Sequence, residues 1–188
     1  QDTIETVIQR RGSSRQFRRA PITHSQLSTM LDRACTGMVA DFPAGAGATL
    51  NQLYLIVNDV DGLPAGSYVF HRGSSVLEQL REGDFRGRAG YLDLGQELAA
   101  DAGVNVYFLA DLHAALERYG NRGYRMSQLE AAIMGGRLYL GAYAQGLGAT
   151  GLTFFDDEVT EFFSPHAQGK SVMFLVALGK PAPRRRRA

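Results

Sequence analysis

Two arginines and two serines stand close together near the N-terminus, in the segment Arg-Gly-Ser-Ser-Arg-Gln-Phe at residues 11–17. Its guanidiniums offer forked donors, its serines offer hydroxyl donors, and Gly12 leaves backbone N–H groups open. Phosphate groups are bound by donors of these kinds. The segment lacks the Gly-Lys-Ser/Thr ending of a Walker loop. It is a candidate anion site, and the alternative interpretation is a solvated basic turn.

Other residue types that could do chemistry are scattered along the chain. The four histidines form no pair at helical ligand spacing, so the sequence predicts no metal site. No Gly-x-Ser-x-Gly motif is present, and Cys35 lies in an apolar helical stripe, which favours a packed thiol over a nucleophile. A single cysteine also excludes a disulfide framework.

The periodicity of apolar residues predicts the elements that position these groups. We expect helices over residues 3–10, 26–36, 124–145 and 156–163. We expect strands over residues 53–57, 67–71, 104–109, 150–154 and 172–178. Helices and strands follow one another without regular alternation, which predicts an α+β fold, a mixed β-sheet flanked by helices.

Length and charge limit the protein class. The 188 residues, 45% hydrophobic, suit a single domain over residues 1–181, followed by a basic tail over 182–188. The net charge of +1 includes four arginines at 184–187, and the body without them carries net −3, so we expect no nucleic-acid partner. No apolar run approaches the ~20 residues of a membrane span, and the N-terminus does not look like a signal peptide. We therefore expect no membrane association and a cytoplasmic location.

Several sequence blocks occur in an order typical of one enzyme family. The blocks are Arg-x-Ser-x-Arg-x-Phe at 11–17, Gly-Leu-x-x-Gly-x-Tyr at 62–68, Arg-Tyr-Gly-Asn at 118–121, Leu-Glu-Ala-Ala at 129–132, Gly-Leu-Gly-Ala at 146–149 and Val-Ala-Leu-Gly-Lys-Pro at 176–181. Together they resemble the FMN-dependent nitroreductase family, and residues 53–68 are similar to its SagB-type branch, the azoline dehydrogenases. The resemblance implies a nitroreductase-like fold and a homodimer with FMN at the interface. In this branch two such domains are also fused in one polypeptide.

The resemblance assigns the FMN phosphate to the two ends of the chain. It implies phosphate contacts from Arg11, Ser13 and Arg15, with Gly12 between them. Basic residues near the C-terminus of family members often reach the same phosphate, frequently across the dimer, which points to Lys180 and Arg184. The alternative for the C-terminal residues is a solvated tail.

Contacts with the flavin ring are implied at two further places. A loop with Pro43, Ala44 and Gly45 would touch the ring, and Ala44 lacks the hydroxyl that the branch usually has there. A backbone N–H at Thr153 or Phe154 would meet flavin N5, where it favours the electron-rich reduced ring.

The pair Arg118-Tyr119 departs from the Lys-Tyr pair of azoline dehydrogenases. Arginine stays protonated and cannot replace a lysine base, which argues against azoline oxidation by the usual route. Tyr119 could act as a general acid, and the alternative is an aromatic cap at a helix start.

These features favour an FMN-dependent oxidoreductase that passes electrons between NAD(P)H and a small-molecule substrate in a ping-pong scheme. One alternative is a SagB-type dehydrogenase that oxidises azolines in a modified peptide. Another is a catalytically degenerate domain that serves as a flavin-binding or dimerisation module.

Overall fold

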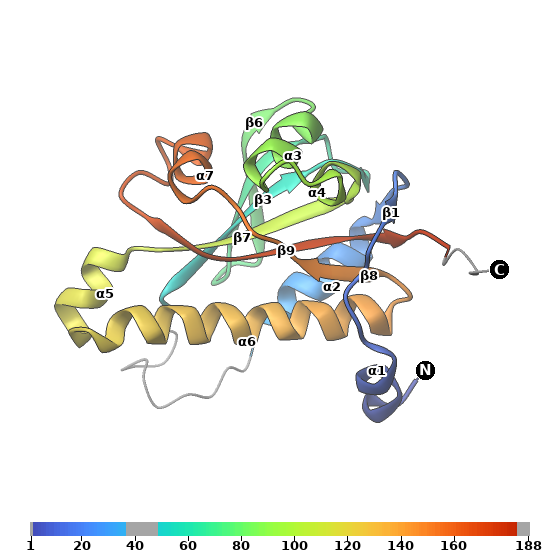
Figure 1. Cartoon of the computed structure of the whole chain (residues 1–188), viewed down its shortest axis with the longest axis horizontal. Helices are drawn as coiled ribbons and strands as arrows, with labels where there is room; N and C mark the ends of the chain where they lie inside the picture. Colours follow the sequence, from blue (N-terminus) through green and yellow to red (C-terminus); the bar gives the residue numbers. More distant parts are fainter. Residues whose placement is uncertain (1, 37–48, 184–188) are drawn as a thin grey trace.

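The computed structural model describes residues 2–36 and 49–183, which form a main sheet with helices on both faces and a small second sheet (Figure 1). The main sheet has the strand order β1-β9-β7-β3-β5-β6, and β8 pairs with β9 beside this path. Its strands are β1 (Phe17–Arg18), β3 (Asn51–Val57), β5 (Gly66–His71), β6 (Val76–Glu82), β7 (Val104–Ala110), β8 (Gly148–Gly151) and β9 (Ser171–Pro181). All of these pairings are antiparallel, whereas β2 (Ile22–Thr23) and β4 (Val60–Asp61) form a separate parallel pair. The predicted α+β class is confirmed.

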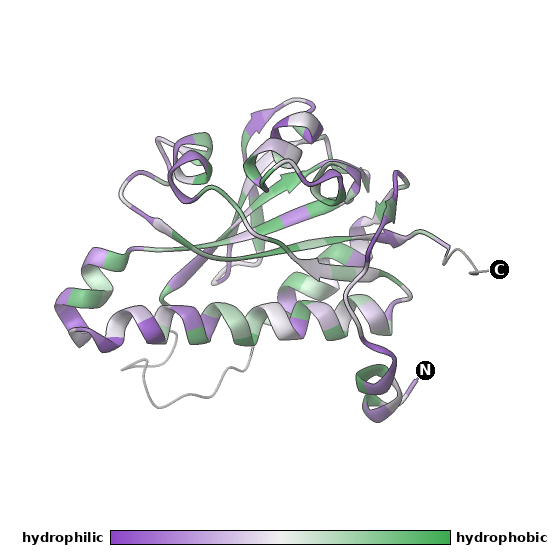
Figure 2. Ribbon diagram, viewed as in Figure 1, coloured by the Kyte–Doolittle hydropathy of each residue, from purple (hydrophilic) through white to green (hydrophobic). Residues whose placement is uncertain are grey.

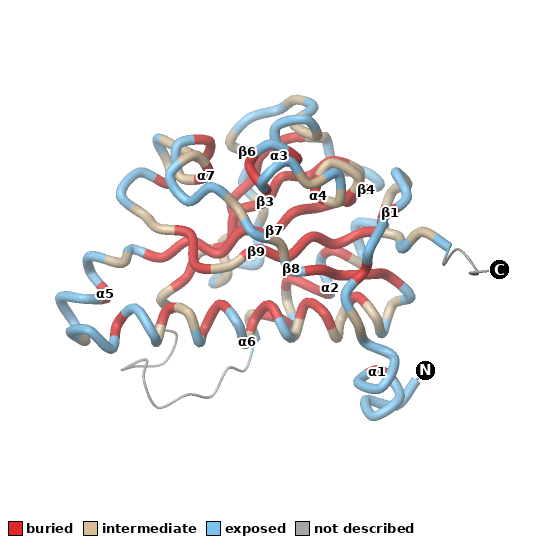
Figure 3. The backbone as a smooth tube through the Cα atoms, viewed as in Figure 1, coloured by how far each residue is buried: buried red, intermediate tan, exposed pale blue. Residues whose placement is uncertain are grey.

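Helices cover the two faces of the sheet in two groups. The helices are α1 (Ile4–Arg10), α2 (His24–Cys35), α3 (Arg86–Leu92), α4 (Glu97–Asp101), α5 (Leu112–Tyr119), α6 (Arg122–Ala144) and α7 (Asp156–Phe163). Helices α2 and α6 pack on one face, and α3, α4 and α7 pack on the other (Figure 1). Every residue of β7 is buried, because both faces of this central strand are covered (Figure 3). Figure 2 shows the matching concentration of hydrophobic residues in the central strands.

The long helix and its neighbour match their predicted positions closely. The helix predicted over 124–145 is α6, and the one predicted over 26–36 is α2. A capping box starts α2, in which Thr23 accepts from the Gln26 N–H and the Gln26 side chain accepts from the Thr23 N–H. No helix in the described residues has the length and apolar character that crossing a membrane requires.

The strand predicted over 150–154 is wrong in position. Strand β8 ends at Gly151, and the chain then leaves the sheet toward α7. The Phe155 N–H donates to the Leu92 carbonyl at 2.9 Å, so α3 takes the bond that a longer strand would have given to β9. The apolar run in this stretch therefore reflects packing against α3 rather than strand pairing.

Candidate functional site

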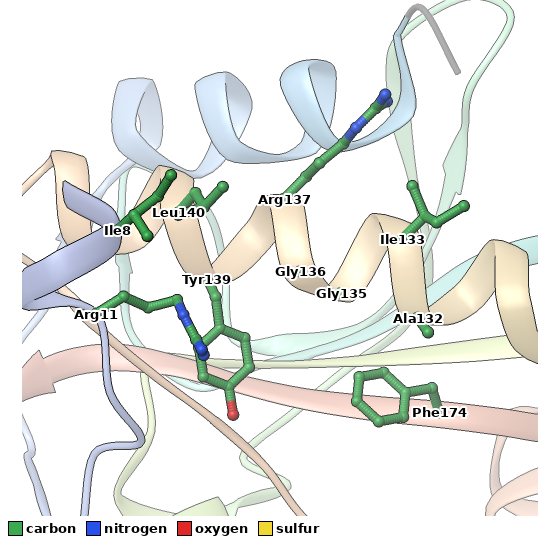
Figure 4. A pocket seen from close by; sticks show the side chains of 10 residues that line it. All are labelled: Ile8, Arg11, Ala132, Ile133, Gly135, Gly136, Arg137, Tyr139, Leu140 and Phe174. Carbon is green, nitrogen blue, oxygen red and sulfur yellow. The ribbon is translucent and has the colours of Figure 1, made fainter. Parts of the chain in front are cut away.

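A pocket of about 600 Å³ lies between α1 and α6, within the usual range for ligand sites. It is lined by Ile8, Arg11, Ala132, Ile133, Gly135, Gly136, Arg137, Tyr139, Leu140 and Phe174. Figure 4 shows Arg11 extending across the ring of Tyr139, with Phe174 of β9 beside the same side of α6. The first arginine of the candidate anion motif thus lines a pocket.

Close packing against Phe174 shapes one wall of this pocket. A Cβ on Gly135 would lie 2.6 Å from Phe174 Cε1, so this position of α6 must be glycine for the ring to fit. The neighbouring Gly136 meets nothing within 4 Å, although it also lines the pocket. Of the two adjacent glycines, only Gly135 is therefore required by close packing within this chain.

Backbone hydrogen bonds hold the motif 11–17 between β8 and the residue that follows β9. The Ser14 N–H donates to the Ala149 carbonyl at 2.9 Å, and the Ala182 N–H donates to the Gln16 carbonyl at 3.0 Å. The adjoining β1 pairs with β9, with Arg18 opposite Lys180. The structure therefore places the N-terminal motif beside the C-terminal strand.

Side chains of the motif point to different environments. Arg11, Ser13 and Arg15 are exposed, while Ser14 is buried. A Cβ on Gly148 would lie 2.1 Å from Ser14 Oγ, so glycine at this position makes room for the inward-facing serine. The outward-facing side chains are the ones available to a ligand.

Residues 151–155 leave the sheet at Gly151, next to two residues that line the pocket. A Cβ on Gly151 would lie 3.5 Å from Phe174 Cζ and 3.6 Å from the Tyr139 hydroxyl oxygen. The N–H groups of Gly151 and Phe155 are both bonded, to the Tyr139 hydroxyl and to the Leu92 carbonyl. Between these anchors, the N–H groups of Thr153 and Phe154 donate to no other described residue. The two backbone donors predicted to meet a flavin are therefore free to bind a ligand.

Tyr139 is a site residue that the sequence analysis missed. Its hydroxyl accepts from the Gly151 N–H and lies 3.4 Å from Ser13 Oγ. Its ring centroid lies 5.5 Å from the guanidinium carbon of Arg11, in cation–π range. A tyrosine on the sheet-facing side of α6, one turn after a glycine pair, is the signal that could have indicated it.

Arg118 and Tyr119 lie at the other end of α6. They end α5, and the Arg118 guanidinium carbon lies 5.1 Å from the Tyr119 ring centroid. The Tyr119 hydroxyl is buried and has no hydrogen-bond partner among residues 2–36 and 49–183. At 1.5 Å per residue, the start of α6 is roughly 20 Å from Gly136. Tyr119 and Thr153 are therefore not brought together within this chain.

Some predicted contacts cannot be placed. Pro43, Ala44 and Gly45 of the predicted ring-contact loop lie outside the described residues, as does Arg184 of the tail.

A second polar cluster, around Glu130, is closed and buried. Glu130 Oε2 accepts from the N–H groups of Leu50 and Asn51 and from Asn51 Nδ2, at 2.7–2.9 Å. Its Oε1 accepts from Arg72 at 3.1 Å, and the carboxylate has almost no exposed surface. Glu130 thus ties α6 to the start of β3, and offers no free atom to a ligand.

A third polar group, Asp93, lies behind the donor segment. Asp93 Oδ1 accepts from the Tyr107 hydroxyl at 3.0 Å, and burial raises the pKa of this carboxyl to about 8. Its Oδ2 is buried with no partner in the described part of the chain. The Gln96 side chain donates both to the Asp93 carbonyl and to Thr153 Oγ1, so the Asp93 turn backs the crossing segment.

Cysteine and metal chemistry gain no support. Burial raises the pKa of the Cys35 thiol to about 11, which keeps it protonated and fits the packed role predicted for it. Within the described ranges, no three His, Cys, Asp or Glu side chains are grouped so as to hold a metal ion.

Comparison with known proteins places this site in a family. A sequence model described as "Nitroreductase family" matches residues 8–180. A Methanocaldococcus jannaschii protein named as a nitroreductase is 27% identical over 164 residues, which cover 84% of this chain and 82% of that protein.

Solved structures share the fold over nearly the whole chain. An Anabaena variabilis protein described as a nitroreductase superposes with a TM-score of 0.85 at 31% identity. The match covers 95% of this chain but 38% of that protein, so this chain spans well under half the length of that relative. The NADPH:FMN oxidoreductase of Vibrio harveyi, in complex with NAD⁺, matches with a TM-score of 0.67 at 15% identity, over 100% of this chain and 74% of that one.

A further match is to a chain of the Escherichia coli microcin synthetase complex McbBCD, with a TM-score of 0.76 at 18% identity. It covers 92% of this chain and 70% of that one. At these identities the last two matches show the fold alone. The family match spans most of the sequence, including the motif at 11–17 and the crossing segment at 151–155, and the chain belongs to the nitroreductase family.

Proposed function

We propose that the chain is an FMN-dependent oxidoreductase that binds FMN in the pocket beside α6. The observation that carries this proposal is the pair of free backbone donors at Thr153 and Phe154, which follow Gly151 along the chain. Gly151 lies against Tyr139 and Phe174, which line the same pocket as Arg11. A flat, anionic cofactor fits these residues, because Tyr139 and Phe174 offer aromatic walls and the exposed arginines offer donors for a phosphate. The Vibrio harveyi neighbour, named for NADPH and FMN, supports the same cofactor.

Each part of the site would have its own task. Arg11, Ser13 and Arg15 would bind the phosphate, and Lys180 on the adjoining strand and Arg184 beyond it would add positive charge. The N–H groups of Thr153 and Phe154 would donate to the ring edge that becomes electron-rich on reduction. Bound FMN supplies hydride acceptance and donation at its N5 atom. The chain contributes binding, orientation and these donors, and NAD(P)H and a small molecule would be the electron donor and acceptor.

A second nitroreductase-like domain would complete the site. Both α1 and α6 carry exposed apolar side chains: Ile4 and Ile8 are 55% and 54% exposed, and Leu129 is 50% exposed. A homodimer would cover these side chains, and so would a fused partner domain in a longer polypeptide. Sedimentation of the purified chain separates a dimer from a monomer that needs a partner domain. We include a cytoplasmic location in the proposal, since flavin reduction by NAD(P)H depends on cytoplasmic nucleotide.

Titration of the apoprotein with FMN tests this proposal. We expect binding with a changed flavin spectrum, and bleaching under anaerobic NADPH or NADH. The Arg11→Ala/Arg15→Ala double variant should bind FMN at least about 100-fold more weakly, since hydrogen bonds to charged groups contribute about 1.5–3 kcal/mol each.

An Arg33→Ala/Arg122→Ala variant, which removes the same charge from exposed positions on α2 and at the start of α6, should bind like the wild type. A wild-type protein that binds no FMN would contradict the proposal. FMN binding without reduction by either nucleotide would favour the degenerate flavin-binding module.

The azoline dehydrogenase remains a second candidate because of the McbBCD neighbour. Arg118 stands where that chemistry uses lysine, and the Tyr119 hydroxyl is buried rather than open to the pocket. A synthetic thiazoline peptide offered to the FMN-loaded protein separates the two functions. Thiazole formation would support the azoline function, and turnover of a quinone or nitroaromatic alone would favour the general oxidoreductase.

A further inference from the structure

We propose that Tyr139 is a positioning residue that couples the phosphate motif at 11–15 to the donor segment at 151–155, so that the two halves of the site order together. This inference rests on the proposed function for its consequence in FMN binding. The coupling itself is a property of the chain, and it can be measured without the cofactor.

Three contacts place Tyr139 between the two segments. Its hydroxyl oxygen accepts from the Gly151 N–H, which is the first anchor of the donor segment. The same oxygen lies 3.4 Å from Ser13 Oγ. The Arg11 guanidinium carbon lies 5.5 Å from the ring centroid. One side chain on α6 therefore touches two segments that are more than 130 residues apart in sequence.

The hydrogen-bonding capacity of a phenol suits this linking role. A tyrosine hydroxyl has one proton to donate and lone pairs with which to accept. Because Gly151 is the donor in its bond, the tyrosine proton is left for Ser13 Oγ or for a ligand atom between them. A phenylalanine at this position keeps the ring under Arg11 but loses both hydroxyl contacts.

The surroundings of Tyr139 hold it rigidly between the two segments. Tyr139 is 9% exposed and stands on the longest helix, whose neighbouring Leu138 and Ala142 are fully buried. Gly151 ends β8, which is paired along its whole length with β9. The Ser13 segment is held by the bond from the Ser14 N–H to the Ala149 carbonyl. Loss of the tyrosine hydroxyl leaves the Gly151 N–H without its partner exactly where the donor segment begins to leave the sheet.

Hydrogen exchange of the apoprotein tests the coupling directly. In Tyr139→Phe we expect faster amide exchange in peptides that cover both 11–15 and 148–155. The matched control is Tyr143→Phe, one helical turn further along α6. The Tyr143 hydroxyl lies beside Gly12, where a Cβ would be 3.8 Å away, but it makes no hydrogen bond to a described residue. This control should therefore exchange like the wild type.

FMN titration of the same proteins tests the consequence. Tyr139→Phe should bind FMN about 10-fold more weakly, as expected for one lost hydrogen bond and an N–H left unpaired. The midpoint potential of the bound flavin should also become more negative, because its N5 donors are less firmly held. Tyr143→Phe should match the wild type in both measurements.

Each outcome bears on one of the two proposals. Unchanged exchange in Tyr139→Phe, or faster exchange in only one of the two segments, overturns the coupling. Faster exchange in both segments together with unchanged FMN affinity and potential in Tyr139→Phe supports the coupling and overturns its consequence for FMN binding. A wild-type protein that fails to bind FMN contradicts the proposed function, and the exchange data then decide the role of Tyr139 alone.

Discussion

Two polar clusters on the same helix differ in what they leave unpaired. Around Glu130, both carboxylate oxygens are bonded and the group is buried. Around Tyr139, nine residues further along α6, Arg11 and Ser13 are exposed, and the nearby Thr153 N–H has no protein acceptor among the described residues. The first cluster is complete within the chain, whereas the second has donors in excess.

This difference distinguishes a cluster that stabilises the fold from a cluster that can bind a ligand. A buried carboxylate with all its bonds satisfied stabilises the fold, and it has nothing to offer a ligand. Surplus donors beside a pocket are what an anionic or electron-rich ligand requires. Variants in the cluster around Glu130 should therefore change the stability of the fold, and variants in the cluster around Tyr139 should change ligand binding.

The largest expected effect is at Glu130. Glu130→Gln removes the charge that faces Arg72 and leaves one amide oxygen for two sets of donors. If that oxygen keeps the Leu50 and Asn51 N–H groups, the amide NH2 group faces the Arg72 guanidinium. Breaking a buried ion pair by removing one partner costs about 3–5 kcal/mol. Urea denaturation should show a loss of this size in the free energy of unfolding, with FMN affinity of the folded fraction little changed.

Glu117→Gln is the matched control for this variant, since Glu117 pairs with His113 on an exposed part of α5. Exposed pairs contribute about 0–1 kcal/mol, so the control should stay close to wild type. An equal loss in both variants would show that the Glu130 cluster is not the structural centre we describe.

An effect of comparable size is a pH dependence at Asp93. Like Glu130, this carboxyl is buried, and one of its oxygens has no partner among the described residues. Burial raises the pKa of the folded-state carboxyl to about 8, whereas an unfolded aspartate titrates near ~3.9. The folded chain thus holds a proton that the unfolded chain releases. The stabilisation is full below pH ~4 and declines as pH rises to about 8, by up to about 1.4 kcal/mol per pH unit.

Asp93→Asn should abolish that decline, so its unfolding free energy relative to wild type should rise between pH 5 and 8. Urea denaturation at several pH values measures the difference. Asp157→Asn, at an exposed position of α7, serves as the control for general effects of acid removal. Parallel pH profiles for wild type and Asp93→Asn would mean that Asp93 is ionised in the folded protein.

The sequence predicts the elements with strong apolar periodicity and misses those without it. The sequence predicts helix α6 and strands β3, β5, β7 and β9, because their buried faces require apolar residues at regular spacing or in continuous runs. Strand β6 was missed because it is an edge strand with the charged sequence Val-Leu-Glu-Gln-Leu-Arg-Glu. Helices α3 and α4 are short, and tertiary contacts determine them more than local propensity does.

The site divides in a similar way. The motif at 11–17 could be found because its donors are adjacent in sequence. Its role as an anion site stays a prediction, and so does the contribution of Lys180, which lies opposite Arg18. Tyr139 could not be found in this way, since its partners Arg11, Ser13 and Gly151 become neighbours only through folding. Phosphate and flavin contacts of the motif itself remain predictions.

The third prediction concerns the adjacent glycines Gly135 and Gly136, where we expect smaller changes in the free energy of unfolding. Gly135→Ala places a methyl 2.6 Å from Phe174 Cε1 and should destabilise the protein by about 1–3 kcal/mol, the usual cost of overpacking. Gly136→Ala meets nothing within 4 Å and should stabilise the apoprotein by up to about 1 kcal/mol through helix propensity. Thermal unfolding measures both changes.

Because Gly136 lines the pocket, its alanine variant should nevertheless weaken FMN binding several-fold. Gain of stability with loss of binding is the result expected if the space beside Gly136 is kept for a ligand. A Gly136→Ala protein with unchanged affinity would place the ligand elsewhere.

The smallest effect on activity and stability is expected at Tyr119, whose hydroxyl oxygen is buried, like the Glu130 carboxylate, but unpaired among the described residues. Its hydroxyl has no partner in the described part of the chain, as at an open site, but it is buried and stands at the far end of α6 from the pocket. If unpaired atoms alone marked a functional site, Tyr119→Phe would abolish activity.

We expect a functional site to require access for a ligand as well as an unpaired atom. Removing this hydroxyl relieves a buried unpaired group, so stability should stay constant or rise by about 1 kcal/mol, and the rate of FMN-dependent reduction should stay within about 2-fold of wild type. Steady-state kinetics with NADPH and a quinone measure the rate. A large fall in kcat with unchanged stability would establish Tyr119 as a catalytic acid, and would require the α5–α6 turn of one copy to reach the pocket of another.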